Sequence, residues 1–134
     1  MADILEKIVN VSATNVTLTT TSETVIISSG EITIPFATAL ILIRAWAQLT
    51  TGAATTTVTP RIRRGTAVGG TLVGEANAIT IGAAAGSNEQ FFIMVMEERA
   101  DQARVEYSLT LQQASATGNG TALQAGIEVE VLSG

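Results

Sequence analysis

Residues 104–113 read RVEYSLTLQQ, and this stretch decides the fold class. Apolar residues occupy the odd positions from Val105 to Leu111, and polar residues occupy the even positions from Arg104 to Thr110. Because successive side chains of a β-strand point to opposite faces, this alternation predicts a half-buried strand. The apolar row is expected to face the core and the polar row to face water.

The last segment of the chain shows the same pattern. Its odd positions from Leu123 to Val131 are apolar, while Gln124, Glu128 and Glu130 are polar. Residues 114–120 (ASATGNG), between the two segments, are small, polar and rich in glycine, which is typical of a loop. We therefore expect the two strands to form an antiparallel pair.

Further strand signals occur earlier in the chain. Segments 15–20, 23–28 and 31–36 read as short strands. Two other segments, 38–49 and 91–96, carry apolar residues on both faces, although a strand of a two-layer sandwich needs only one apolar face. After the second of these, Glu97, Glu98 and Arg99, with Asp101, are expected to form a polar turn.

These strands predict an all-β protein, an antiparallel β-sandwich that is jelly-roll-like. Residues 15–134 are expected to form this single domain, and residues 1–14 an N-terminal arm or edge strand. Helix cover, long loops or another copy of the chain would each explain the doubly apolar strands. No segment shows a convincing helical period, so burial in an oligomer is the preferred explanation.

The composition excludes several classes of function. The 134 residues include 7 Lys and Arg, 12 Asp and Glu, and neither His nor Cys. Thiolate zinc sites, disulfides and the commonest general base are therefore excluded. The net charge of -5 opposes non-specific binding to nucleic acid. The most apolar stretch, 39–47, is too short to span a bilayer. We expect neither nucleic acid nor membrane as a partner.

The densest charge cluster lies in the string PRIRRGT. On a strand, Arg61 and Arg63 share one face and Arg64 points to the other. Guanidinium groups bind carboxylates or phosphates of a partner, although a solvated strand face is the simpler explanation. Arg44 and Trp46 lie on the amphipathic face of segment 38–49, and Trp46 is a candidate for a subunit or partner contact. Together these five residues are the predicted contact residues.

No motif in the sequence predicts catalysis or cofactor binding. Glu128 and Glu130 share a strand face, as paired carboxylates of a glycosidase would, but this alternation is typical of a strand that faces water. The glycine-rich string 65–74 (GTAVGGTLVG) lacks the Lys-Ser/Thr ending of a P-loop and instead predicts a hairpin. We therefore predict no catalytic, cofactor-binding or metal-binding residue.

Several strings together resemble a known group of proteins. They are RIRRGT (61–66), GGTLVG (69–74), VEYSLTLQQASATGNGTA (105–122) and IEVEVL (127–132). Their order resembles that in small virion structural proteins of tailed phages, and the Tyr-x-Leu-x-Leu strand, glycine-rich turn and closing strand resemble the end of tumour necrosis factor-like jelly rolls. The resemblance covers about residues 38–132. It implies a sandwich that trimerises around an axis and carries no catalytic residues.

The expected function is therefore that of a non-enzymatic structural protein of a phage virion. The resemblance implies a trimer on a capsid or tail surface that acts as a decoration, cement or fibre-associated protein. Among these we expect a capsid decoration, or cement, protein that is made in the host cytoplasm, forms a homotrimer on the capsid surface and stabilises the shell. Its partners would be itself and the major capsid protein or another virion protein. The alternative is a receptor- or glycan-binding head of a tail fibre or lectin-like protein, and a carboxylate-based enzyme ranks third.

Overall fold

The computed structural model describes residues 4–12, 15–34, 39–51, 54–82, 87–99, 104–115 and 119–133. These residues form strands and turns, and none of them lies in a helix, so no described helix is long and apolar enough to cross a membrane. In chain order the strands are β1 (Ile4–Ser12), β2 (Val16–Thr17), β3 (Thr24–Ser28), β4 (Ile32–Thr33), β5 (Ala39–Thr50), β6 (Thr56–Arg64), β7 (Leu72–Glu75), β8 (Ile79–Ile81), β9 (Asn88–Arg99), β10 (Arg104–Val105), β11 (Tyr107–Gln113) and β12 (Thr121–Ser133).

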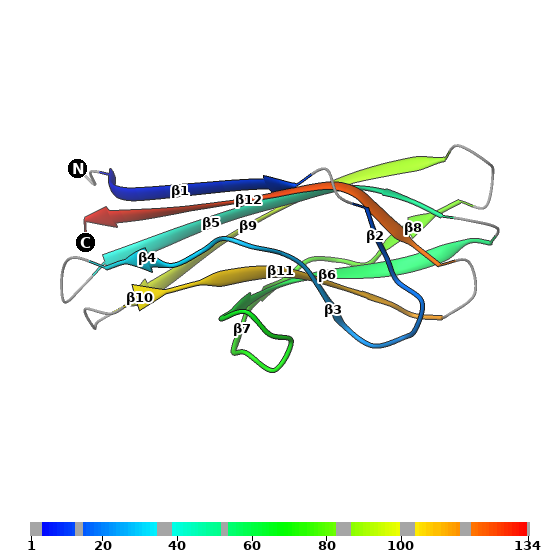
Figure 1. The fold of residues 1–134 in the computed structure, drawn as a ribbon, viewed down its shortest axis with the longest axis horizontal. Helices are drawn as coiled ribbons and strands as arrows, with labels where there is room; N and C mark the ends of the chain where they lie inside the picture. Colours follow the sequence, from blue (N-terminus) through cyan, green and yellow to red (C-terminus); the bar gives the residue numbers. More distant parts are fainter. Residues whose placement is uncertain are drawn as a thin grey trace.

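The strands form two antiparallel sheets that lie face to face (Figure 1). Sheet A has the order β1-β12-β5-β9, with β2 also paired to β12, and sheet B has the order β3-β11-β6-β7, with β8 also paired to β6. The short strands β4 and β10 pair with each other. Most connections pass from one sheet to the other, which is the jelly-roll arrangement. The predicted antiparallel β-sandwich is therefore confirmed.

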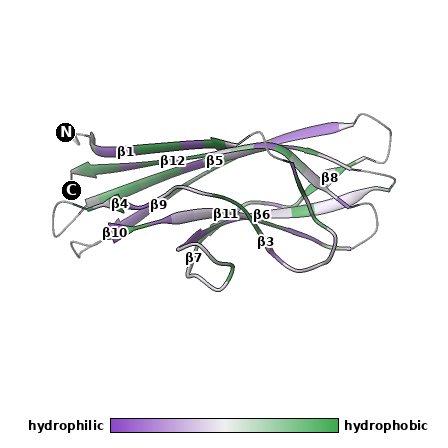
Figure 2. Cartoon of the chain, viewed as in Figure 1, coloured by the Kyte–Doolittle hydropathy of each residue, from purple (hydrophilic) through white to green (hydrophobic). Residues whose placement is uncertain are grey.

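The core lies between the sheets and comes from alternate residues of the long strands. Ile41, Ile43, Ile127 and Val129 of sheet A are fully buried, and so is Leu109 of sheet B. Figure 2 shows long hydrophobic stretches along β1, β12 and β5. The period-2 patterns seen in the sequence thus mark the inner faces of the two sheets.

The predicted pairing of residues 104–113 with the last strand is wrong. β11 pairs with β3 and β6 in sheet B, whereas β12 pairs with β1, β2 and β5 in sheet A. The buried Gln113 donates hydrogen bonds to the carbonyl oxygens of Leu18 and Thr20 and accepts one from the Gly120 N–H. The chain therefore crosses from sheet B to sheet A between β11 and β12, and the apolar rows of these two strands face each other across the core.

The prediction that the polar row of β11 faces water is wrong at Ser108 and Thr110. Ser108 and Thr110 are fully buried. The Ser108 hydroxyl donates to the Gly65 carbonyl at 2.5 Å, and the Thr110 hydroxyl donates to Glu23 at 2.7 Å. A loop and a neighbouring acidic side chain therefore cover this face, and small hydroxyl residues fill the space while satisfying their hydrogen bonds.

Two other strand predictions need correction. Glu97–Arg99 is not a turn, because β9 continues through these residues and pairs with Ala39–Ile41. In β12 the register shifts between Ala122 and Gln124, so Ala122 is the buried residue and Leu123 is only half-buried.

The three short segments predicted early in the chain form strands at fewer residues than expected. The observed strands there are β2, β3 and β4. The end of the third predicted segment, residues 35 and 36, lies outside the described residues, as do Asp101 and residues 116–118 of the predicted loop.

Candidate functional site

The outer face of sheet A carries side chains in rows that cross the strands. The register of the sheet defines these rows, because directly opposed residues of neighbouring strands share a face. Taken from β9 through β5 and β12 to β1, the rows are Met96-Leu42-Glu130-Lys7, Met94-Arg44-Glu128-Val9, Phe92-Trp46-Gly126-Val11 and, without a residue of β1, Gln90-Gln48-Gln124.

Ion pairs occupy the centre of this face. Arg44 Nη1 lies 3.2 Å from Glu128 Oε1 and 3.0 Å from Glu130 Oε1, while Lys7 Nζ lies 3.2 Å and 3.7 Å from the same oxygens. A hydrogen bond with the Glu130 carboxyl, followed by the charges of Lys7 and Arg44, lowers the pKa of Glu128. The two carboxylates therefore bind cations of their own chain.

Trp46 lies beside this ionic cluster and is half-buried. A Cβ atom at Gly126 would overlap the six-membered ring of the Trp46 indole, so the ring rests directly on the backbone of β12. Glycine is needed at this position because no other residue leaves room for the ring. The six-membered ring of the indole therefore packs against the sheet, and the side chain as a whole is only half-buried.

The β9 stripe, which consists of Phe92, Met94 and Met96, is the most exposed apolar feature of sheet A. These side chains are 60%, 57% and 62% exposed. Their neighbours Phe91 and Ile93 point inward and are buried. β9 is the end strand of the described sheet, so one of its edges has no neighbouring strand within sheet A. Large apolar side chains on an edge strand favour association with another polypeptide.

A small hollow lies at the end of the sheet beyond Phe92. Its volume is about 120 Å³, and it is lined by Trp46, Ala47, Gln48, Gln90, Phe91 and Gln124. Three amide side chains from three adjacent strands therefore line the hollow together with Trp46. No lining residue is charged.

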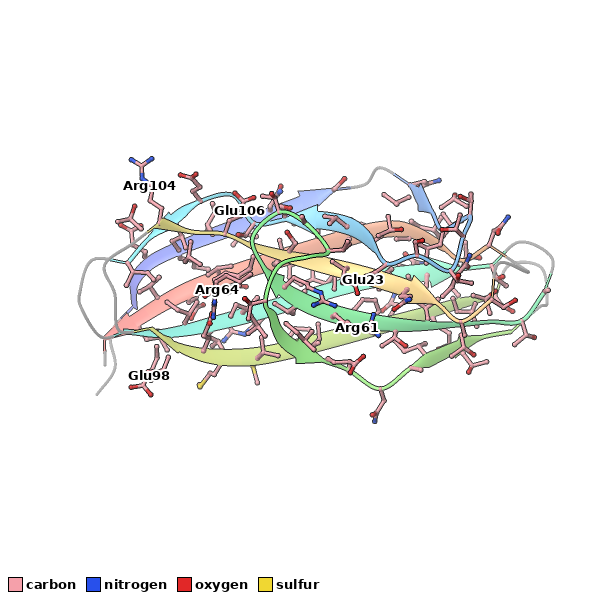
Figure 3. The ribbon with its side chains drawn as sticks, turned by 90° about the horizontal axis from the view of Figure 1, so that it is seen from below. Glu23, Arg61, Arg64, Glu98, Arg104 and Glu106 are labelled. Atoms are coloured by element: carbon pink, nitrogen blue, oxygen red, sulfur yellow. The ribbon has the colours of Figure 1, made fainter. Side chains whose placement is uncertain are left out.

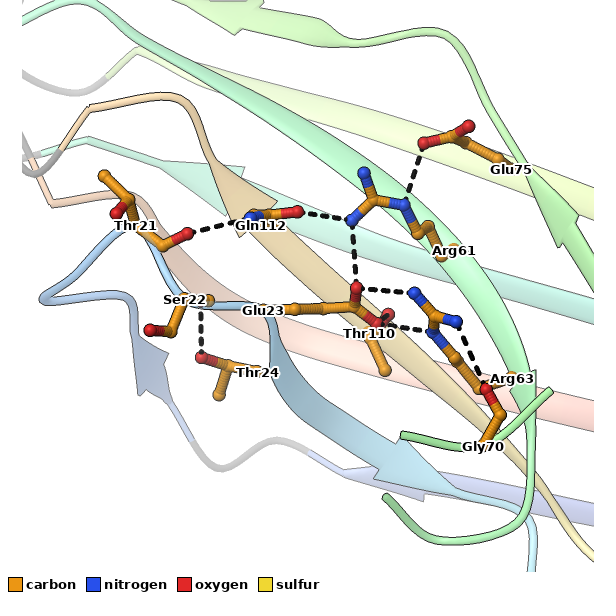
Figure 4. A network of polar contacts seen from close by, with 10 residues as sticks. All are labelled: Thr21, Ser22, Glu23, Thr24, Arg61, Arg63, Gly70, Glu75, Thr110 and Gln112. Carbon is orange, nitrogen blue, oxygen red and sulfur yellow. Dashed lines mark hydrogen bonds and ion pairs between the residues drawn. The ribbon is translucent and has the colours of Figure 1, made fainter. Parts of the chain in front are cut away.

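The outer face of sheet B carries a second polar cluster, centred on Glu23 (Figure 4). Arg63 Nε and Nη2 donate to the two Glu23 oxygens, each at 2.8 Å, and Arg61 Nη1 donates at 3.0 Å. Arg61 also donates to Glu75 at 2.8 Å and to Gln112 at 2.6 Å. Figure 3 shows Glu23 and Arg61 close together on this face.

The Glu23 cluster perturbs the titration of its members. The hydrogen bond from Arg63 is the main cause that lowers the pKa of Glu23, and it outweighs the effect of burial. The same hydrogen bond raises the pKa of Arg63. Glu23 accordingly stays ionised at neutral pH and joins β3 to β6 and β11.

Arg64 points to the opposite face, as the alternation predicts. Its guanidinium pairs with Glu97 of β9, and the Tyr107 hydroxyl donates to the other oxygen of the same carboxylate. This contact joins the two sheets near one end of the sandwich. Glu97 therefore binds Arg64 and Tyr107 of sheet B, and it does so from within β9, which continues past Met96 to Arg99.

The structure thus separates the five predicted contact residues. Arg44 and Trp46 lie together on sheet A, Arg61 and Arg63 lie on sheet B, and Arg64 lies between the sheets. All four arginines already form ion pairs within the chain, and their role in contacts with a partner stays a prediction.

Neither Glu23 nor the amide row was among the predicted site residues, and Glu97 was expected in a polar turn. Glu23 is a lone acid in a threonine-rich segment, so nothing local marks it as the partner of two arginines. Gln48, Gln90 and Gln124 come from three separate strands, and only the register brings them together. Among the described residues, no group of three or more His, Cys, Asp or Glu side chains is arranged to hold a metal ion.

Comparisons with known proteins give a likeness at the level of the fold. No family model matches the chain, and no curated protein matches it. A solved structure of infectious bursal disease virus, Gx strain, matches with a TM-score of 0.55 and 13% identity over 96% of this chain and 32% of that chain. The STIV MCP matches with a TM-score of 0.43 and 13% identity, over 96% of this chain and 48% of that chain.

The chain therefore spans about a third of the length of the infectious bursal disease virus protein. At this identity the likeness concerns the arrangement of the strands and nothing finer. The chain is thus similar in fold to part of this infectious bursal disease virus structure.

Proposed function

We propose that this protein is a non-enzymatic structural component of a virus particle and that it acts as an oligomer. The observation that carries the proposal is the β9 stripe, in which Phe92, Met94 and Met96 are each more than half exposed on an end strand. In a single chain these side chains contact water, which is unfavourable for large apolar groups. A subunit contact would bury them.

Arg44 and Trp46 lie one strand inward from the stripe, in the same rows as Met94 and Phe92. We propose them as the polar and aromatic rim of the same interface, because aromatic residues and arginine are enriched in such contacts. Arg61, Arg63 and Arg64 would contact a partner only in addition to the ion pairs that they already form.

The finer proposal is a homotrimeric capsid decoration, or cement, protein of a tailed phage. Its partners would be other copies of itself and the major capsid protein or another virion protein, on the capsid surface. The sequence resemblance and the capsid-like fold support this proposal. Repeated weak contacts also suit a decoration protein, since symmetry converts them into strong attachment.

The test of the oligomer is the mass in solution, measured by light scattering across a dilution series. We expect a stable mass of three chains. The triple variant Phe92→Ser, Met94→Ser, Met96→Ser should shift to one chain while it keeps a β-rich circular dichroism spectrum. The matched control Val68→Ser, Leu72→Ser changes apolar side chains that are 40% and 46% exposed on another hairpin and should stay trimeric.

A monomeric wild-type protein at all concentrations, or a trimer that tolerates the triple variant, would contradict the proposed interface. The virion role is tested separately by co-sedimentation of the purified protein with expanded capsids that lack it. Attachment that saturates at a fixed ratio to the capsid protein supports a decoration protein, and absence of binding opposes one.

A second candidate function is a receptor- or glycan-binding head. The specific observation in its favour is the hollow beside Trp46, where amide groups and an aromatic ring lie together.

A further inference from the structure

The amide row at the end of sheet A is not needed for the subunit contact proposed above. Gln124 of β12 lies opposite Gln48 of β5, and Gln48 lies opposite Gln90 of β9. Gln90 and Gln124 are exposed, and Gln48 is half-buried. Within the described residues, these amide groups form no hydrogen bond with the protein. Each therefore offers both a donor and an acceptor to a ligand.

Trp46 forms the wall of the hollow next to this row. Because its six-membered ring packs against Gly126, the indole is held in place before any ligand arrives. The hollow of about 120 Å³ is thus bounded by a fixed aromatic surface and by amides. Its lining carries no charge, so it contains no group that would select an anionic or cationic ligand.

We infer that this hollow binds a neutral pyranose unit of a glycan. The C–H face of a pyranose is apolar and stacks on an aromatic ring, while its neighbouring hydroxyl groups both donate and accept hydrogen bonds. The Trp46 ring and the amide row supply these two kinds of contact side by side. This inference deepens the second candidate function, and it requires that the interface proposed above leaves the Trp46 ring accessible at its rim.

The hollow and the β9 stripe are successive along the strand. Gln90 precedes Phe92, Met94 and Met96, and all four point to the outer face. An oligomer that buries Met94 and Met96 would leave the amide row at its rim. Several copies of a weak sugar site would then face the same way, which raises the avidity for a surface that carries many glycans.

The test uses Trp46 as its own reporter, because it is the only tryptophan in the chain. The probes are methyl β-D-galactopyranoside, methyl α-D-glucopyranoside and methyl N-acetyl-β-D-glucosaminide. We expect at least one of them to change the tryptophan emission saturably, with a Kd of about 1 mM. The anionic N-acetylneuraminic acid should bind at least about tenfold more weakly, since no cation lines the hollow.

Two variants test the amides without changing the ring. Gln90→Met and Gln124→Met keep the side-chain length, remove the hydrogen-bonding amide groups and should each raise the Kd by about tenfold. Asn77→Leu removes an exposed amide between β7 and β8 of sheet B, which does not line the hollow, and should leave the Kd within about twofold. Thermal midpoints confirm that each variant is folded.

The inference is overturned if no neutral pyranoside changes the emission at concentrations up to about 100 mM, or if the two glutamine variants bind as the wild type does. A saturable response to N-acetylglutamine amide, with none to the sugars, would instead assign the hollow to a side chain of another protein subunit and would also overturn it. The light-scattering mass is independent of these readouts, so failure of either proposal leaves the other testable.

Discussion

At the scale of single residues, the chain uses its few charges inside its own fold. Glu23 accepts hydrogen bonds from Arg61, Arg63 and Thr110, and Glu97 binds Arg64 and Tyr107. Charge-assisted hydrogen bonds of this kind are stronger than those between neutral groups. The four arginines predicted to contact a partner thus already form ion pairs within the chain, although Arg64 Nε is buried without a hydrogen-bond partner among the described residues. The exposed apolar residues are therefore the better candidates for contacts.

Replacement of Glu23 by Gln should destabilise the protein by about 2 kcal/mol at neutral pH, because two guanidinium groups lose their partner. The folded-state pKa of Glu23 lies below its ordinary value of 4.5, so its contribution is present above that pH and is lost as the pH falls below it. The stability of Glu23→Gln should therefore fall less steeply in acid than that of the wild type. Urea unfolding from pH 7 to pH 3 measures both effects.

Glu31→Gln is the matched control. The Glu31–Arg104 ion pair has side chains that are 61% and 75% exposed, and exposed pairs contribute little to stability. Equal stabilities of Glu23→Gln and the wild type at neutral pH would show that the Glu23 cluster does not hold β3, β6 and β11 together.

Gly126→Ala should displace the Trp46 ring, because the new methyl group overlaps it. We expect a red shift of the tryptophan emission and a loss of about 1–2 kcal/mol of stability, as in other overpacked sites. Gly82→Ala is the control, since its nearest neighbour would be 3.9 Å away. An unchanged emission spectrum in Gly126→Ala would mean that the ring does not rest on β12.

At the scale of the elements, a strand's position in its sheet decides how its two faces are used. β5 and β12 lie between other strands of sheet A and bury their inner rows, while β9 lies at the end and exposes its outer row. β11 is central in sheet B and is buried on both faces, since Ser108 and Thr110 are covered as well. The two doubly apolar segments of the sequence therefore have different explanations. In β5 the outer row turns polar and pairs with neighbours, whereas in β9 the outer row stays apolar and open.

Hydrogen exchange should reproduce this order of the strands. Amides of β5, β11 and β12 are expected to exchange slowest, because these strands are paired on both sides and exchange through global unfolding. β2, β7 and β8 are short strands at the margins of the sheets and should exchange by local opening. Peptide-resolved mass spectrometry measures the rates, and faster exchange in β11 than in β7 would contradict the described topology.

At the scale of the whole molecule, pairing between residues distant in sequence dominates the fold. β1 pairs with β12, so the first and the last strand of the chain lie side by side in sheet A. β3 pairs with β11, and β5 pairs with β12. A sandwich of this kind closes large loops before its core is buried, which slows folding.

We therefore expect folding in about milliseconds to seconds, slower than for helical domains of similar length. Stopped-flow dilution from urea, followed by the emission of Trp46, measures the rate. Because Trp46 packs on Gly126 of β12, the change in emission should coincide with formation of sheet A. A microsecond phase that accounts for the whole change would show that local contacts, and not the sheet, determine this signal.

The sequence alone determined the fold class, the inward rows of the long strands except at Leu123, and the hairpin between Arg64 and Leu72, because these depend on the period-2 alternation and on local turn chemistry. The face assignment of Arg61, Arg63 and Arg64 also followed from alternation. The alternation contains no information about which strands become neighbours. The predicted pairing of β11 with β12 was therefore wrong.

Only the tertiary structure decided what covers each outer face. The burial of Ser108 and Thr110, the partners of Glu23 and Glu97, and the amide row beside Trp46 all depend on the register between strands that are far apart in the chain. Register is set by the fit of two sheets around one core, and no local pattern contains it. The stripe on β9 was visible in the sequence as surplus apolar residues, but its exposure followed only from the position of β9 at the end of the sheet.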